Sequence, residues 1–197
     1  MYPKSFKKLI DNFASLPSVG PKMSERLVLY LLKSEKGKIR NFSENLLAIL
    51  DLKNCPKCFN ISEDGLCEIC KDSRRDNSVV CVVEEPLDIF SIEKTGIFKG
   101  LYHVLGGVLQ TTVNGENKDL KIPQLLKRIE VEKIKEVIIA TNPTTEGDIT
   151  ALYLKKKLAP LDVFVTRLGR GLSTGGDIEY VDDITLSSAF SNRKELI

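Results

Sequence analysis

Four of the five cysteines stand in two pairs of equal spacing, Cys55 with Cys58 and Cys67 with Cys70. In a cytoplasmic protein, thiols at this spacing are more often metal ligands than disulfides. Each C-x-x-C turn brings two thiolates to one point, and two such turns complete the tetrahedral sulfur set that suits zinc. A redox-active thiol pair and an iron–sulfur cluster are the alternatives. We predict that the four cysteines bind one Zn²⁺ ion per chain.

The segment around these cysteines, residues 54–77, is predicted to be a small zinc module. It contains few large apolar side chains, so burial alone cannot stabilise its fold. Metal binding, worth roughly 10–16 kcal/mol in small zinc modules, must do so. Gly65 supplies a flexible corner before the second cysteine pair. Because protein sulfurs fill all four positions, the zinc is predicted to be structural. Cys81, in the apolar run 79–83, is predicted to be a buried strand residue.

Three acidic residues form a second candidate site: Glu84, Glu146 and Asp148. They lie in the part of the chain where apolar strand patterns alternate with helix patterns. Such alternation predicts a parallel sheet, and sites in these sheets lie at the carboxyl ends of strands. All three acids are expected at that edge. The strands are predicted at residues 79–83, 101–105, 136–141 and 163–165, and the helices at residues 120–132 and 148–158.

Two amphipathic helices are predicted near the N-terminus. Apolar residues recur at helical spacing through residues 4–14. A turn rich in helix breakers follows, and Pro21 suits the first position of a second helix that runs to about Leu32. The side predicted to be buried carries Met23, Leu27 and Leu31, and another face carries Lys22, Arg26 and Lys33. A third helix is predicted at residues 43–51, with Ser43 as its N-cap.

Positive charge is concentrated in the first quarter of the chain. The whole chain carries a net charge of +2, whereas residues 1–53 contain ten Lys and Arg against five Asp and Glu. A basic segment of this kind suits a phosphate-bearing partner; a solvated basic face without a partner is the alternative. No apolar run approaches the ~18 residues of a membrane-spanning helix, and residues 1–8 lack the apolar stretch of a signal peptide. We expect a cytoplasmic protein without a membrane partner.

The turn between the first two helices, L-P-S-V-G-P at residues 16–21, resembles a helix-hairpin-helix motif. The resemblance implies that backbone N–H groups at the turn and at the following helix N-terminus face a DNA phosphate. Such binding is largely independent of base sequence. Ser18 stands where the motif has its first glycine, which is a departure from the pattern. A helical hairpin used for dimer packing is the alternative. The residues implied to bind DNA are Gly20, Lys22, Arg26 and Lys33.

The acidic site resembles that of a Toprim domain, with V-V-E at residues 82–84 and E-G-D at residues 146–148. Catalytic members of that family hold Mg²⁺ with a D-x-D pair that precedes the second motif. Here those two positions are Asn142 and Thr144, and neutral side chains cannot replace the charges that offset dehydration of Mg²⁺. Two-metal phosphoryl chemistry is therefore not expected. A Toprim-type metal-dependent nuclease or primase-like enzyme with a reduced acid set is the alternative.

The order of features along nearly the whole chain resembles the bacterial RecR family of recombination mediators. The matching stretches include L-P-S-V-G-P-K, both cysteine pairs, C-V-V-E-E-P-L-D-I, L-Y-H-V-L-G-G, A-T-N-P-T-T-E-G-D and G-G-D-I-E-Y. The resemblance implies a non-catalytic protein of recombinational DNA repair that acts with RecO and RecF to load recombinase on single-stranded or gapped DNA. It also implies a ring-like homotetramer that encircles DNA. The Toprim acids Glu84, Glu146 and Asp148 are then candidates for contacting RecO.

The predicted architecture is a multidomain α/β fold. It comprises a helix-hairpin-helix DNA-binding domain at residues 1–53, a C4 zinc finger at 54–77, a Toprim-like α/β domain with a mostly parallel sheet at 78–172, and a glycine-rich and helical C-terminal segment at 173–197 for subunit contact.

Two further features favour structural roles. His103 is the only histidine, and without a base beside a nucleophile it is predicted to be a structural strand residue. Segment 169–177 lacks the G-K-[ST] of a phosphate loop, so it is predicted to be a turn used in folding back or in subunit contact. Arg167 and Arg170 are candidate DNA contacts inside a ring. A zinc adaptor that makes no DNA contact is the third functional alternative.

Overall fold

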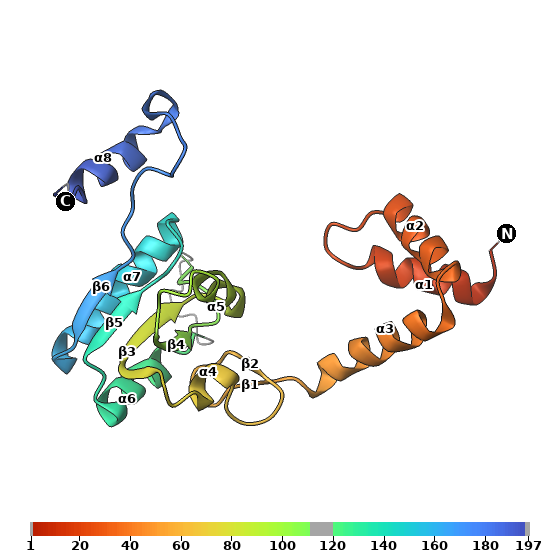
Figure 1. Ribbon diagram of the computed structural model, residues 1–197, viewed down its shortest axis with the longest axis horizontal. Coiled ribbons are helices and arrows are strands. Elements are labelled where there is room, and N and C mark those ends of the chain that lie inside the picture. Colours follow the sequence, from red (N-terminus) through yellow and green to blue (C-terminus); the bar gives the residue numbers. More distant parts are fainter. Residues whose placement is uncertain (1, 111–119, 196–197) are drawn as a thin grey trace. The chain divides into compact units, whose positions relative to one another are not determined.

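The computed structural model describes residues 2–110 and 120–195 of the 197-residue chain, which divides into two compact units between Leu52 and Lys53. Residues 111–119 and 196–197, which belong to the predicted segments 78–172 and 173–197, lie outside the described residues. Figure 1 follows the elements of both units along the chain. Within the described ranges, no helix combines the length and the apolar content needed to cross a bilayer.

The first unit is built from helices. They are α1 (Lys4–Ala14), α2 (Pro21–Leu32) and α3 (Lys36–Ala48), the last continued by a 3-10 turn at Ile49–Asp51. α1 and α2 pack against each other as a hairpin. The predicted bounds of these two helices are confirmed. Pro21 occupies the first turn of α2, where its missing N–H breaks no helical hydrogen bond.

The buried side of α2 differs from the prediction. Met23 is 50% exposed, and the helix instead buries Ser24 and Val28. The hydroxyl of Ser24 donates to the backbone oxygen of Gly20 at 3.0 Å, so this polar side chain is satisfied in a packed position. The prediction that Met23 faces inward is therefore wrong.

Helix α3 begins at Lys36, seven residues before the predicted start. Ser43 lies inside the helix, where its hydroxyl donates to the backbone oxygen of Arg40 at 2.8 Å. The predicted N-cap at Ser43 is therefore wrong. No side-chain cap bond marks the observed start of α3, and Gly37 lies in its first turn, so the sequence carries no ordinary start signal there.

The zinc module opens the second unit. Strands β1 (Lys53–Asn54) and β2 (Ile61–Ser62) pair antiparallel, and the short helix α4 (Glu68–Lys71) follows them. The first cysteine pair lies in the loop between the two strands, and the second pair brackets the start of α4. The hairpin thus folds the two pairs toward one another.

A four-stranded parallel sheet forms the body of the second unit, in the order β4-β3-β5-β6. The four predicted strands and the two predicted helices are confirmed in type, with ends shifted by up to three residues. The strands are β3 (Asp76–Val83), β4 (Gly100–Val104), β5 (Glu136–Ile139) and β6 (Phe164–Arg167), and the helices are α6 (Ile122–Glu132) and α7 (Thr145–Leu158). A further helix, α5 (Pro86–Glu93), was not predicted.

Helices cover the sheet on opposite faces because the chain reverses its direction across it. The connection from β3 leads to β4 at one edge of the sheet, whereas the connections from β4 to β5 and from β5 to β6 lead toward the opposite edge. Because such crossovers are right-handed, α5 lies on one face of the sheet, and α6 and α7 lie on the other. Two cores result. One packs Leu125 of α6 and Leu154 of α7 on the sheet, and the other packs Ile89 of α5 beside Cys81. Cys81 is only 2% exposed, which confirms it as a buried strand residue.

This reversal creates a switch point between β3 and β5. The two strands are neighbours, yet their onward connections leave toward opposite sides of the sheet. Open parallel sheets place their sites at the carboxyl ends of such strands. Glu84 directly follows β3, and Asn142 lies three residues beyond the end of β5. The fold therefore brings these two residues to one edge of the sheet.

The chain after β6 is irregular until a 3-10 turn at Ile178–Tyr180 and the helix α8 (Asp183–Ser191). Asp182 caps α8 by accepting a hydrogen bond from the backbone N–H of Thr185 at 2.9 Å. The side chain of Asn192 donates to the backbone oxygen of Arg170 at 3.1 Å, which ties the end of α8 to the segment that leaves β6.

Candidate functional site

The four paired cysteines converge on one point. Their sulfur atoms all lie within 4.8 Å of one another, and among the described residues this is the only group of three or more potential ligands close enough to hold a metal ion. Tetrahedral zinc with Zn–S bonds of about 2.3 Å separates its sulfurs by roughly 3.8 Å. Cys55, Cys58 and Cys67 are buried and Cys70 is half-buried. The donor set therefore fits one structural Zn²⁺ ion.

Hydrogen bonds within the peptide chain shape the first cysteine turn. The backbone N–H of Cys55 donates to the oxygen of Asn60 at 2.7 Å, and the N–H of Phe59 donates back to the oxygen of Cys55 at 2.9 Å. Phe59 takes a left-handed conformation with φ of 63°. This positive φ bends the chain sharply after Cys58, which turns both sulfurs of the pair toward the same point.

The second cysteine pair is held by a turn and a short helix. Gly65 has φ of 61°, a conformation that glycine adopts without strain, and its backbone oxygen accepts from the hydroxyl of Ser62 at 3.0 Å. Cys67 then starts the turn of α4. The neighbouring thiols of Cys58, whose sulfur lies 3.5 Å away, and of Cys70 lower the pKa of the Cys67 thiol well below its ordinary value. A thiolate is the ligand that zinc requires.

The zinc module is fastened to the carboxyl end of β4. The backbone N–H of Val104 donates to the oxygen of Cys58 at 2.8 Å, and the ring of Phe59 packs edge-on against His103 with centroids 5.3 Å apart. His103 is fully buried, and its Nε2 lies 2.9 Å from the oxygen of Lys121. Burial lowers the pKa of His103 to about 4, so the ring is neutral near pH 7. Its position supports the structural interpretation.

The turn between α1 and α2 exposes the groups implied to bind DNA. The N–H of Val19 donates to the oxygen of Leu16 at 3.1 Å, and Ser18 between them has φ of 64°. Serine thus adopts the left-handed conformation that a glycine would take at this position. Gly20 precedes α2 without any side-chain cap, which leaves N–H groups of the first helical turn free to face an anion.

The three basic residues of the same region are exposed: Lys22, Arg26 and Lys33. Within the described part of the chain, no ion pair engages any of them. They are placed in the first turn, in the middle and just after the end of α2. The structure therefore leaves their charges available to a phosphate-bearing partner.

At the switch point, Glu84 is held by Asn142. One carboxylate oxygen of Glu84 accepts from the backbone N–H of Asn142 at 2.7 Å, and the other accepts from its side-chain amide at 2.6 Å. The Glu84 residue is only 9% exposed. The neutral residue at the first D-x-D position is thus a direct partner of the acid that would otherwise help to bind a metal.

Thr144, at the second D-x-D position, caps α7. Its hydroxyl accepts a hydrogen bond from the backbone N–H of Gly147 at 3.1 Å. α7 consequently begins at Thr145, three residues before the predicted start, so Glu146 and Asp148 lie in its first turn. Acidic residues are favourable there because they face the positive end of the helix dipole.

Gly147, in the first turn of α7, packs too closely against Asn142 and Glu84 to leave room for a side chain. A Cβ atom at this position would lie 2.1 Å from the backbone oxygen of Asn142 and 3.2 Å from Glu84 Oε1. The hydroxyl of Thr141 donates to the backbone oxygen of Gly147 at 2.9 Å, which fixes the approach. The glycine of the E-G-D motif therefore allows the backbone of α7 to approach the backbone of Asn142 closely.

Asp148 is paired with two arginines. Its carboxylate accepts from Arg167 at 2.6 Å and from both terminal nitrogens of Arg170, one of them at 3.1 Å. Arg170 and Arg167 hold the pKa of this carboxyl at about 2. Sequence reasoning placed these arginines with DNA and missed the pairing. The signal available was the R-x-x-R spacing that leaves β6, because β6 neighbours β5 and so ends beside the start of α7.

Glu146 is the most accessible of the three acids. Its side chain is exposed, and in the ranges that the structure describes only its backbone oxygen has a side-chain partner, the hydroxyl of Thr150. The acids therefore do not converge on one point as a metal site would require. Glu84 faces Asn142, Asp148 faces the arginines, and Glu146 faces solvent.

Comparison with known proteins agrees with this arrangement. Family models match in chain order: the RecR helix-hairpin-helix at residues 6–50, the four-cysteine zinc finger domain of RecR at 52–72, a Toprim domain at 78–169, and the RecR C-terminal region at 171–194. The chain is 50% identical over 193 residues to the recombination protein RecR of Chloroflexus aggregans, covering 96% of this chain and 93% of the relative.

The chain belongs to the RecR family. Other relatives carry the same name. That of Herpetosiphon aurantiacus is 46% identical over 195 residues, 98% of this chain and 96% of its own length. That of Bifidobacterium animalis subsp. lactis is 45% identical over 196 residues, 99% of this chain and 98% of its own length.

Membership of the RecR family confirms two predictions. All four paired cysteines fall within the match to the zinc finger domain of RecR and also cluster in the structure, so the chain has one structural zinc site. The multidomain α/β architecture, with a helical hairpin, a zinc module and a parallel Toprim sheet, is likewise confirmed.

Proposed function

We propose that the chain is a non-catalytic DNA-binding mediator of recombinational repair. The observation that carries the proposal is the state of the Toprim acids, which are engaged by Asn142 and by two arginines instead of converging on a metal. The relatives are named recombination proteins, and the basic turn before α2 suits a DNA backbone. These observations together favour a protein that holds DNA and does not cut it.

The DNA contact is proposed at the turn between α1 and α2. Gly20 leaves the first N–H groups of α2 without a side-chain cap, while Lys22 and Arg26 stand exposed on the same helix. Lys33, just past the end of α2, adds a further exposed charge. Contacts of this kind reach phosphate oxygens and carry no base information. Binding is therefore expected to depend strongly on salt and weakly on sequence.

The same site supports the proposed absence of catalysis. Mg²⁺ takes oxygen ligands in near-octahedral geometry and gives up its water reluctantly. Glu84 is buried against Asn142, and Asp148 is already neutralised by Arg167 and Arg170. A metal ion would have to displace these partners, and two-metal chemistry would have to do so twice.

The remaining parts of the proposal concern partners and assembly. We propose that the protein acts in the cytoplasm with RecO and RecF to load recombinase on single-stranded or gapped DNA, as a ring-like homotetramer. The four proposed domains are residues 1–53, 54–77, 78–172 and 173–197, the last serving subunit contact. Among the Toprim acids, Glu146 is the best placed for RecO because it is exposed, while Glu84 and Asp148 shape the surface around it.

The DNA contact is tested by binding of the zinc-loaded full chain to a gapped duplex over a range of salt. Lys22→Ala and Arg26→Ala should each weaken binding and reduce the slope of log affinity against log salt by about one. Lys155→Ala, which removes an exposed charge from α7 instead, is the matched control. If Lys22→Ala and Arg26→Ala leave both affinity and slope at the control's values, the contact is not at this turn.

The RecO contact is tested by retention of purified RecO on the immobilised protein. Glu146→Gln should reduce retention several-fold, whereas Glu130→Gln, which changes another exposed glutamate on α6, should not. Equal retention by both variants would remove Glu146 from the interface.

A further inference from the structure

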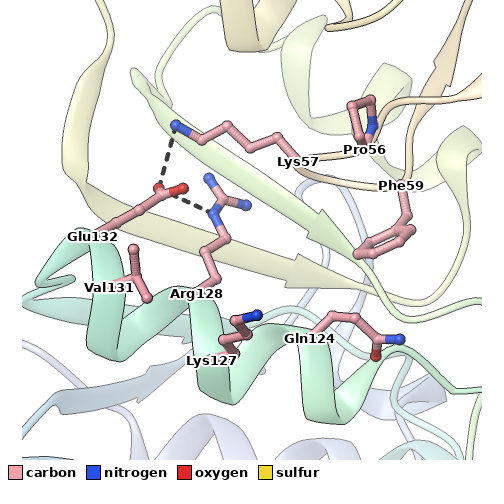
Figure 2. Close-up of a pocket in the computed structure, with 8 residues that line it drawn as sticks. All are labelled: Pro56, Lys57, Phe59, Gln124, Lys127, Arg128, Val131 and Glu132. Carbon is pink, nitrogen blue, oxygen red and sulfur yellow. Dashed lines mark hydrogen bonds and ion pairs between the residues drawn. The ribbon is translucent and has the colours of Figure 1, made fainter.

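We infer that a groove between the zinc module and α6 is a binding site for a phosphate group, distinct from the proposed DNA contact before α2. Figure 2 shows the groove. Five side chains rise from α6 on one side, and the first cysteine turn supplies the other. Its volume is about 270 Å³, and its lining residues are Pro56, Lys57, Phe59, Gln124, Lys127, Arg128, Val131 and Glu132.

The groove carries an excess of positive charge. Its lining includes three cations, Lys57, Lys127 and Arg128, and a single carboxylate, Glu132, which leaves a formal excess of two positive charges. A phosphate group carries up to two negative charges and presents several acceptor oxygens, so it matches both the charge and the number of donors.

The groove also holds a buried guanidinium nitrogen without an acceptor. The side chain of Arg128 is only 6% exposed. Its Nη1 donates to the backbone oxygen of Tyr102 at 2.7 Å and its Nε donates to Glu132 at 3.1 Å, whereas Nη2 has no hydrogen-bond partner among the described residues. Leaving a buried charged donor unsatisfied is costly. An acceptor oxygen brought by a ligand in this groove would satisfy it.

Glu132 already occupies the place of an anion. One of its carboxylate oxygens accepts from both Lys57 at 3.2 Å and Arg128 at 3.1 Å, and Figure 2 shows the two dashed contacts meeting there. Two cations of the groove, Lys57 and Arg128, can therefore bind the same oxygen atom. A phosphate entering it competes with Glu132 for these donors and gains Lys127, which is exposed and has no ion pair within the described ranges.

The apolar lining indicates what the phosphate is attached to. Pro56, Phe59 and Val131 border the charged residues, and Gln124 adds an amide at the same edge. The volume exceeds that of a bare phosphate and leaves room for a sugar beside it. The shared chemistry is therefore a phosphate ester, supplied either by a nucleic-acid backbone or by a free nucleotide.

The test is a titration of the zinc-loaded full chain with thymidine monophosphate, inorganic phosphate and a short oligothymidylate at constant ionic strength. Lys127→Gln should weaken binding of the phosphate esters about tenfold, the loss of one charge-assisted hydrogen bond. Glu132→Gln should strengthen it several-fold, because the competing internal carboxylate is gone. Lys135→Gln, an exposed change outside the groove, is the control and should leave the affinity unchanged.

The oligothymidylate arm is repeated in a Lys22→Ala, Arg26→Ala background, so that a contact before α2 cannot contribute. Binding of the oligomer that still responds to Lys127→Gln assigns the groove to a nucleic-acid backbone. Binding of the mononucleotide alone with the same response assigns it to a free nucleotide. If affinities for all three probes are unaffected by both Lys127→Gln and Glu132→Gln, the groove is not a phosphate site.

Discussion

Asn142 donates two hydrogen bonds to Glu84, from its backbone N–H at 2.7 Å and from its side-chain amide at 2.6 Å. The two residues follow neighbouring parallel strands at the point where the sheet reverses its connections. In a catalytic Toprim domain an aspartate would stand at position 142, and two carboxylates would face each other across a metal. Here an amide replaces one of them, and the pair is satisfied without an ion.

Substitution of this amide by a carboxylate should make the fold depend on a divalent cation. In Asn142→Asp two like charges meet at hydrogen-bonding distance, which should cost on the order of 2 kcal/mol and lower Tm by roughly 4–8 °C. Mg²⁺ should restore part of this loss in the variant and leave the parent unchanged. The measurement is thermal unfolding with and without Mg²⁺. Asn77→Asp, an exposed change at the start of β3, is the control; a variant as stable as this control would contradict the interpretation.

Asp148 should hold the segment that leaves β6. Asp148→Asn removes the carboxylate that Arg167 and Arg170 share, so amide hydrogen exchange in residues 168–172 should speed up severalfold. The change in global stability should stay under about 1 kcal/mol because the pair is partly exposed. Asp177→Asn, farther along the same irregular segment, should leave that exchange unchanged. Equal protection in both variants would show that the arginines do not fasten the segment.

The five cysteines should separate into two classes. With zinc bound, none should react readily with a thiol reagent; after chelation, four should react and Cys81 should stay inert. Burial raises the pKa of Cys81 to about 12, so almost no reactive thiolate is present at neutral pH. Thiol titration beside measurement of released zinc checks this. The expected release is one ion and four thiols per chain, and a fifth thiol of equal rate would show that Cys81 is not in a closed core.

Replacement of Ser18 by glycine should stabilise the protein. Its φ of 64° lies in the left-handed region, which costs an ordinary residue roughly 1–2 kcal/mol and glycine little. After the entropy that glycine loses on folding, Ser18→Gly should gain about 0.5 kcal/mol. Ser15→Gly, at a position with φ of −78°, should lose stability instead. Hydrogen exchange in α1 and α2 measures both, and a destabilised Ser18→Gly would refute the assigned backbone.

Local sequence patterns predicted most helices and strands because each had a clear periodicity of apolar residues or was bounded by proline or glycine. The alternation of apolar runs was enough to predict the parallel sheet, and the two C-x-x-C turns were enough to predict the zinc module. The third helix was predicted, but its start was placed too late, because α3 begins without a side-chain cap and with Gly37 in its first turn. The orientation of Met23 was not predicted because α2 buries the smaller, polar Ser24 and leaves Met23 half-exposed.

The position of the acidic residues at the edge of the sheet was predicted, but their hydrogen-bond partners were not. Strand order brings Glu84 and Asp148 to one edge, and that much follows from a parallel sheet. Their partners do not, because Arg170 lies 22 residues after Asp148 and reaches it only through the pairing of β6 with β5. The R-x-x-R spacing after β6 indicates this pairing only when the order of the strands is already known. The hydrogen bond from the backbone N–H of Val104 to the oxygen of Cys58, which joins the zinc module to the sheet, was likewise not predicted because the two residues are far apart in the sequence.

The claim that the Toprim scaffold here holds DNA without cutting it is tested most directly by incubating the purified, zinc-loaded chain with labelled gapped DNA and Mg²⁺ or Mn²⁺. We expect a salt-sensitive complex and no strand cleavage above the rate without protein. Metal-dependent cleavage that Glu84→Gln abolishes would contradict the claim.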